Sequence, residues 1–161
     1  MPIAEDRGAG AAPAAADSPL QAVVVAIGEQ RYGLPVELVR EIVPLPALLE
    51  LAGAAATVCG ALNRHGAYIP VIDGRAMVGQ PSHATLDSLV VLAGAAQPQL
   101  GLLVDGVSGV RQFAASQCTR FDGQTVASFL AGIASGDDGP VLLLHVPALL
   151  GMIPALARQQ P

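Results

Sequence analysis

Short apolar segments, rich in β-branched side chains and separated by turn-forming residues, recur along this sequence. Consecutive segments fall into pairs joined by a few residues that favour tight turns, and such pairs are typical of β-hairpins. Four hairpins at fairly regular spacing predict an all-β barrel or sandwich with short helices. The paired segments are 20–27 with 31–35, 57–63 with 67–72, 87–94 with 99–104, and 129–135 with 140–146.

The predicted strands are apolar over several consecutive residues, where a half-exposed strand would alternate with polar residues. LQAVVVAI at 20–27 is the clearest case. This pattern is expected for strands covered on both faces or shared between two packed cores. Aromatic residues make up only 3% of the 161 residues, so Val, Leu, Ile and Ala must fill these cores. The length fits one ordinary domain or two very small ones fused.

Segments outside the hairpins are less regular. Residues 35–43 predict a short helix, because Pro35 suits a first helical turn and Val36, Val39 and Val43 follow helical spacing. Residues 47–56 fit a helical turn or a loop. Three more predictions are a connection over 73–85, an irregular stretch over 114–128 and an apolar helical piece over 147–157.

The two ends differ from the rest of the chain in composition. Residues 1–19 are Ala- and Pro-rich with little to bury, which predicts a disordered arm. The rest of the chain is predicted to divide into an ordered domain over 20–151 and a tail over 152–161. The start of the chain lacks a basic region followed by an apolar one, so we expect no signal peptide and a cytoplasmic protein.

Charge and composition exclude several classes of function. Every formal positive charge is an Arg, so no P-loop lysine and no Schiff-base lysine exists. A net charge of −5 disfavours nucleic-acid binding. No apolar run reaches the roughly 18 residues of a membrane helix, so we expect no direct membrane insertion.

Metal and catalytic signatures are also missing from the sequence. The three His and two Cys lie far apart, which predicts no metal site, no cofactor and reduced thiols. GDDG at 136–139 lacks the spacing of a calcium loop and predicts a hairpin turn. We therefore expect no enzyme activity, although a small-barrel ligand-binding domain or enzyme remains a minor alternative.

Four segments, in order, resemble the CheW-like family of chemotaxis adaptors. They are VVVAIGEQRYGLPVELVREIV at 23–43, VCGALNRHGAYIPVIDGRAMVG at 58–79, LGLLVDGVSGV at 100–110 and VLLLHVPALL at 141–150. The resemblance implies two packed SH3-like five-stranded β-barrels. It implies a non-enzymatic adaptor that couples a CheA-type histidine kinase to methyl-accepting receptors, in chemotaxis or pilus-type motility. Other CheW-like domains are further implied partners, and the place of action is the cytoplasm or a membrane-associated receptor array.

The second segment departs from the family pattern at its turn. Asn63 and Gly66 match the pattern, whereas Arg64 stands where the family usually has Leu or Ile, and His65 replaces a characteristic Arg. In the family that Arg is implicated in partner contacts. Three interpretations follow: a plain hairpin tip, an Arg64 that replaces the missing guanidinium by a one-residue shift, or a weaker pH-dependent contact through His65. Because strand side chains alternate, a shifted Arg would point to the other face.

Other positions carry alternatives of the same kind. Asp73 and Arg75 match the family's Asp-x-Arg, and either pair with each other, cap a turn or contact a partner. In the family the corresponding helix borders the receptor-facing groove, so the resemblance implies that Arg40 and Glu41 contact a partner there; alternatively, the two residues form a solvated face of the predicted helix.

Three further polar or thiol side chains carry structural expectations. Asp105 either bonds its own turn or orders the region between the barrels. Cys59 is expected to be an inert buried residue, and His145 a satisfied core histidine.

The replacement of the family Arg leaves a second function open, a diverged CheW-like protein that binds another signalling or localisation protein. A homo-oligomer built by packing barrel against barrel is a further alternative.

Overall fold

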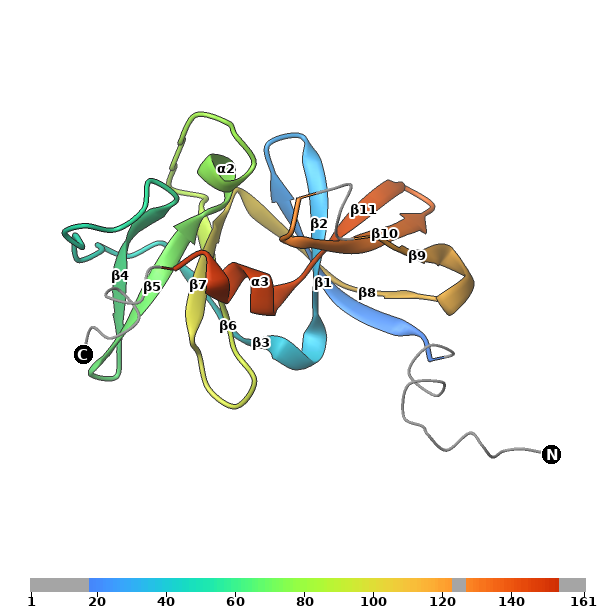
Figure 1. Ribbon diagram of the computed structural model, residues 1–161, viewed down its shortest axis with the longest axis horizontal. Helices are drawn as coiled ribbons and strands as arrows, with labels where there is room; N and C mark the ends of the chain where they lie inside the picture. The colour runs from blue at the N-terminus through green and yellow to red at the C-terminus, as the bar shows by residue number, and fades with distance from the viewer. Residues whose placement is uncertain (1–17, 123–126, 154–161) are drawn as a thin grey trace.

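The computed structural model describes residues 18–122 and 127–153. The predicted arm over 1–19 and the predicted tail over 152–161 therefore lie almost entirely outside the described residues. Within them the chain forms two β-sheets side by side, with short helices between and beside them (Figure 1). The prediction of an all-β fold with short helices is confirmed.

The first sheet has six strands in the order β8-β1-β2-β11-β10-β9. Its strands are β1 (Leu20–Ile27), β2 (Gln30–Pro35), β8 (Gly106–Phe113), β9 (Cys118–Arg120), β10 (Leu130–Gly136) and β11 (Gly139–Leu144). It has one strand more than the five expected, because three residues of the stretch predicted to be irregular, 114–128, form β9 and pair with β10.

The second sheet has five strands in the order β3-β6-β7-β5-β4. Its strands are β3 (Val39–Pro44), β4 (Val58–Arg64), β5 (Ala67–Asp73), β6 (Leu89–Ala93) and β7 (Leu100–Val104). Each sheet contains one parallel pair that joins two hairpins. The pair β2 with β11 joins the first hairpin to the last, and the pair β5 with β7 joins two hairpins that follow one another in the chain. All four predicted hairpins are present as antiparallel pairs.

The helix predicted over 35–43 is wrong. A single 3-10 turn, η2 (Val36–Leu38), leads directly into strand β3, which pairs with β6. Burial along β3 alternates strictly between partly buried and exposed residues, with Val39 and Val43 inward and Arg40 outward. The spacing of the valines fits a strand as well as a helix over so short a segment, and pairing with β6 decides between them.

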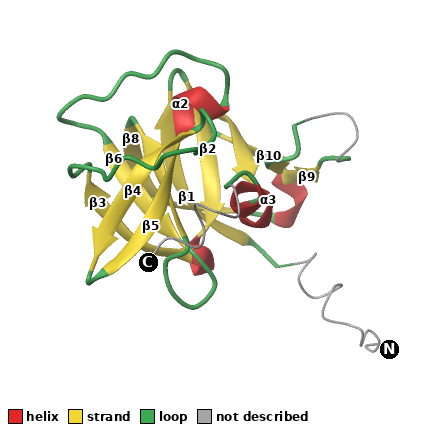
Figure 2. Ribbon diagram, turned by 60° about the vertical axis from the view of Figure 1, so that its left-hand side comes forward, coloured by secondary structure: helices red, strands yellow, loops and turns green. Residues whose placement is uncertain are grey.

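The remaining helices are short and flank the sheets (Figure 2). They are α2 (Gly74–Met77), η3 (Ala115–Gln117) and α3 (Val146–Gly151). Helix α3 falls at the start of the piece predicted to be helical, 147–157, and Pro147 occupies its first turn. The part of that prediction from residue 154 onwards lies outside the described residues.

Three apolar clusters explain why the strands carry apolar residues on both faces. Two small clusters fill the separate barrels, one around Val24 and Phe113 and the other around Val71 and Leu92. The largest cluster lies between the sheets and takes alternate residues from both, such as Val25 and Val91. Burying both faces of β1 and β6 removes apolar area from water on two sides and so stabilises the packing of the barrels together.

One acidic side chain joins the two barrels where the chain passes from β7 to β8. The Asp105 carboxylate accepts a hydrogen bond from the Gly28 amide at 2.6 Å, in the β1–β2 turn, and one from Arg75 Nε at 3.1 Å. Its backbone amide also donates to the Ala26 carbonyl at 2.8 Å. Asp105 therefore orders the region between the barrels, and does not merely bond its own turn.

Candidate partner-binding surface

The tip of the β4–β5 hairpin is a two-residue turn formed by His65 and Gly66. Arg64 and Ala67 are the last paired residues of the two strands. His65 has φ 55° and Gly66 has φ 88°, both in the left-handed region, and a two-residue hairpin turn of the favoured twist requires this. The Asn63 side-chain oxygen accepts a hydrogen bond from the Gly66 amide at 3.1 Å. The sequence N-R-H-G thus fixes the turn and leaves His65 exposed.

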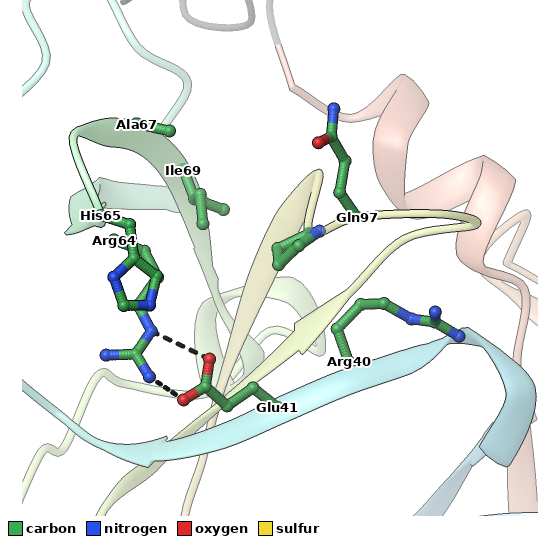
Figure 3. A pocket seen from close by; sticks show the side chains of 8 residues that line it. Arg40, Glu41, Arg64, His65, Ala67, Ile69 and Gln97 are labelled. Carbon is green, nitrogen blue, oxygen red and sulfur yellow. Dashed lines mark hydrogen bonds and ion pairs between the residues drawn. The ribbon is translucent and has the colours of Figure 1, made fainter.

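Arg64 spans the open side of the second barrel. Its guanidinium forms a two-point ion pair with the Glu41 carboxylate, with Nε donating to Oε1 at 2.9 Å and Nη2 donating to Oε2. Glu41 lies on β3 and Arg64 on β4, the two outermost strands of this sheet. Both side chains are about one-third exposed, at 36% and 34%. The ion pair therefore closes the barrel without being buried in it (Figure 3).

The ion pair forms one wall of a groove of about 450 Å³. Arg40 lies across the groove from the hairpin tip in Figure 3, exposed, with its guanidinium donating to the Glu37 carbonyl. The walls are completed by two apolar side chains of β5 and by the β6–β7 turn, namely by Ala67, Ile69, Gln97 and Pro98. With two arginines, one glutamate and one histidine, the lining favours an anionic group beside an apolar one.

The sequence and the family resemblance together predict eight partner-binding residues, and six of them gather around this hairpin and the facing strand. These six are Arg40, Glu41, Asn63, Arg64, His65 and Gly66, and the other two are Asp73 and Arg75. Gln97 and Pro98 were not predicted to line a binding surface, because the sequence identifies them only as part of a hairpin turn. The ion pair between Glu41 and Arg64 could not be predicted from the sequence either. The two residues lie on β3 and β4, which come together only when the sheet closes into a barrel.

Asp73 and Arg75 lie elsewhere, at the opposite end of β5 from the hairpin tip. Asp73 is buried and caps α2, accepting bonds from the amides of Arg75 at 3.0 Å and Ala76 at 3.4 Å, as well as from the Ser82 hydroxyl. Arg75 pairs with Asp105 and not with Asp73. Of the alternatives for these two residues, the structure shows capping for Asp73 and an inter-barrel ion pair for Arg75.

Two expectations about single residues are wrong. Cys59 is exposed rather than buried, because a β-bulge beside it turns the side chain outward on the edge strand β4. Its thiol nevertheless donates to the Val71 carbonyl at 3.5 Å, and desolvation, with a smaller contribution from the Asp73 charge, raises the pKa of Cys59 to about 11. His145 is exposed at the start of α3 rather than placed in a core.

Within residues 18–122 and 127–153, no group of three or more His, Cys, Asp or Glu side chains is arranged to hold a metal ion. No helix in the same part of the chain has the length and apolar character needed to cross a membrane.

Comparisons with known proteins agree with one another. A family model described as a CheW-like domain matches residues 21–153. The chemotaxis protein CheW of Klebsiella aerogenes is 25% identical over 132 residues, which cover 80% of each chain. The probable chemotaxis protein CheW of Rhizobium etli is 32% identical over 85 residues, 52% of this chain and 55% of that one. The crystal structure of the scaffolding protein TtCheW from Thermoanaerobacter tengcongensis superposes with a TM-score of 0.72 at 26% identity, covering 80% of this chain and 90% of that one.

Proposed function

Because this chain belongs to the CheW-like family and is a non-enzymatic chemotaxis adaptor, we propose that it couples a CheA-type histidine kinase to methyl-accepting receptors. The observation that supports this most strongly is the family match over nearly all of the described chain. An adaptor of this kind acts through surfaces, and weak contacts of modest area are enough when an array multiplies them. We place its action in the cytoplasm, at receptor arrays.

We further propose that the groove beside the β4–β5 hairpin tip is one of its partner-binding surfaces. Arg64 supplies the guanidinium that the family pattern has one residue later, and Glu41 holds it in place. His65 and Arg40 line the same groove. A partner carboxylate would meet the guanidiniums of Arg64 and Arg40 while an apolar neighbour packs on Ile69, a combination that uses charge for specificity and apolar contact for affinity.

Calorimetric titration of the full chain with a CheA-type kinase and, separately, with a receptor cytoplasmic fragment tests this proposal. Replacing Arg64 by Ala should weaken binding to at least one partner about tenfold or more. The matched control is Arg31→Ala, because Arg31 is also an ion-paired, partly exposed arginine but lies in the first barrel. Failure of the unaltered chain to bind either partner would reject the coupling function, and equal effects of the two variants would reject this groove.

The replacement of the family Arg by His65 favours a second candidate function, in which this chain binds a different signalling or localisation protein. The change His65→Arg separates the two functions, since it restores the family residue at the exposed tip. A large gain in kinase coupling for this variant would reject the diverged function. Unchanged coupling, together with retained binding to another partner, would support it.

A further inference from the structure

The groove beside the β4–β5 hairpin tip contains a histidine whose backbone position is fixed by the turn. Among the described residues His65 is the one non-glycine residue with a left-handed backbone, at φ 55°. The amide of Gly66 donates to Asn63 Oδ1 at 3.1 Å, and the pairing of Arg64 with Ala67 closes the turn. Histidine tolerates this backbone conformation better than most residues. The turn therefore holds His65 at the edge of the groove, with its side chain exposed.

The other charges that line this groove come from β3 and from the hairpin itself. Arg40 and Glu41 lie on β3, and Arg64 lies next to His65 on the hairpin (Figure 3). The Glu41 carboxylate already accepts a hydrogen bond from Arg64 at each of its oxygens. His65 therefore shares the groove with two guanidiniums and with one carboxylate that is already paired. The lining residues of β5 and of the β6–β7 turn carry no charge; they are Ala67, Ile69, Gln97 and Pro98.

Protonation of His65 doubles the net charge of this lining. Arginine stays charged across the neutral range, whereas histidine is the side chain whose ordinary pKa lies between pH 5 and 8. With a neutral imidazole, two arginines against one glutamate give the lining a formal charge of +1. A protonated imidazole raises this charge to +2. The additional charge strengthens the attraction of an anionic group that enters the groove.

We propose that His65 makes partner binding at this groove depend on pH. An anionic group of the partner, held by the guanidiniums of Arg64 and Arg40, favours the protonated imidazole. Binding therefore takes up a proton and strengthens as the pH falls from about 8 to about 6. An arginine at this position would carry its charge throughout that range and would remove the dependence. The inference rests on the proposed function, because it concerns how the partner-binding groove is regulated.

Calorimetric titration of the full chain at pH 6, 7 and 8 tests this proposal, with a CheA-type kinase and a receptor cytoplasmic fragment as separate titrants. The unaltered chain should bind the partner that uses the groove roughly threefold to fivefold more tightly at pH 6 than at pH 8. His65→Arg should stay tight at pH 8. His65→Asn should stay weak at pH 6, and asparagine tolerates the left-handed backbone of the tip.

The matched control is His145→Asn, because His145 is also exposed but lies at the start of α3, outside the lining of the groove. This variant should keep the full pH dependence. A flat pH profile for the unaltered chain, or the same profile in both His65 variants, would overturn the inference and leave the coupling function standing. Failure of the unaltered chain to bind either partner at every pH would reject the proposed function, and the inference with it.

Proton uptake on binding is a second measurement, independent of affinity. The heat of binding at pH 7 is measured in phosphate and in Tris buffer, whose heats of ionisation differ, and the difference gives the number of protons taken up per complex. The unaltered chain should take up roughly half a proton more than His65→Asn. Equal uptake by the two proteins would contradict a proton held by His65 in the complex.

Discussion

Asp105 illustrates at the scale of a residue how one side chain can hold two barrels together. It is 26% exposed and accepts bonds from a turn of the first barrel and from Arg75 in the second. Asp105→Ala should therefore lower the free energy of unfolding by about 1–3 kcal/mol, as expected for loss of charge-assisted hydrogen bonds. Urea unfolding measures this, with the exposed Asp137→Ala as control. Equal, small effects of both changes would show that Asp105 contributes little to the packing.

The Cys59 thiol leads to a prediction, also at the scale of a residue, about how its reactivity and its effect on stability depend on pH. Desolvation raises the pKa of its thiol to about 11, so the folded chain holds the proton where an unfolded chain has released it. Alkylation of Cys59 at pH 8, in a Cys118→Ser variant, should be roughly a hundredfold slower when folded than in urea, because only the thiolate reacts. By the same linkage this thiol favours the folded state below about pH 9, and that contribution is lost as pH rises towards 11. Equal alkylation rates in the folded and unfolded chains would contradict the placement of this thiol.

At the scale of an element, β3 shows what local sequence can and cannot decide. The hairpins were predictable because their turn residues and apolar runs are contiguous. Segment 35–43 is predicted as a helix because Val36, Val39 and Val43 follow helical spacing. Val39 and Val43 also share one face of a strand, and pairing with the distant strand β6 selects the strand. The ion pair of Glu41 with Arg64 was unpredictable for the same reason, since the sheet must form before β3 and β4 face each other.

The closure of the second barrel by that ion pair leads to a prediction about the two edge strands. A double-mutant cycle with Glu41→Ala and Arg64→Ala should give a coupling free energy of about 0.5–1 kcal/mol, modest because both side chains are one-third exposed. Thermal unfolding of the four proteins measures it. Arg40→Ala should not couple to Arg64→Ala, since Arg40 donates to the Glu37 carbonyl instead. A coupling of zero for the first pair would mean that the ion pair does not hold β3 to β4.

At the scale of the whole molecule, the shared core makes the two barrels one folding unit. Leu102 is fully buried in that core. Leu102→Ala should destabilise the protein by about 2–5 kcal/mol and lower protection from hydrogen exchange in both sheets together. Gln112→Ala, exposed on β8, is the control. Loss of protection confined to the second sheet would show that the barrels unfold independently.

The family and the two-barrel architecture could be predicted from the order of four sequence segments. Apolar runs and turn residues identify strands and hairpins even where individual side chains differ from the family pattern. The proposed partner-binding surface could be predicted from the sequence only in part. Asp73 is the last residue of β5 and Arg75 follows in α2, so both lie at the far end of that strand from the hairpin tip that lines the groove. The strand predicted over 67–72 already implies this separation, whereas the pairing of Arg75 with Asp105 depends on how the two barrels pack and could not be predicted from that strand.

Reconstitution of a signalling complex tests the coupling function most directly. Vesicles bearing a methyl-accepting receptor are mixed with a CheA-type kinase, with and without this chain, and sedimented. We predict that the kinase sediments with the vesicles in amounts that rise and saturate with added chain, and that Arg64→Ala shifts this curve to higher concentration while Arg31→Ala leaves it in place. Kinase sedimentation that is independent of the chain would contradict the proposed coupling.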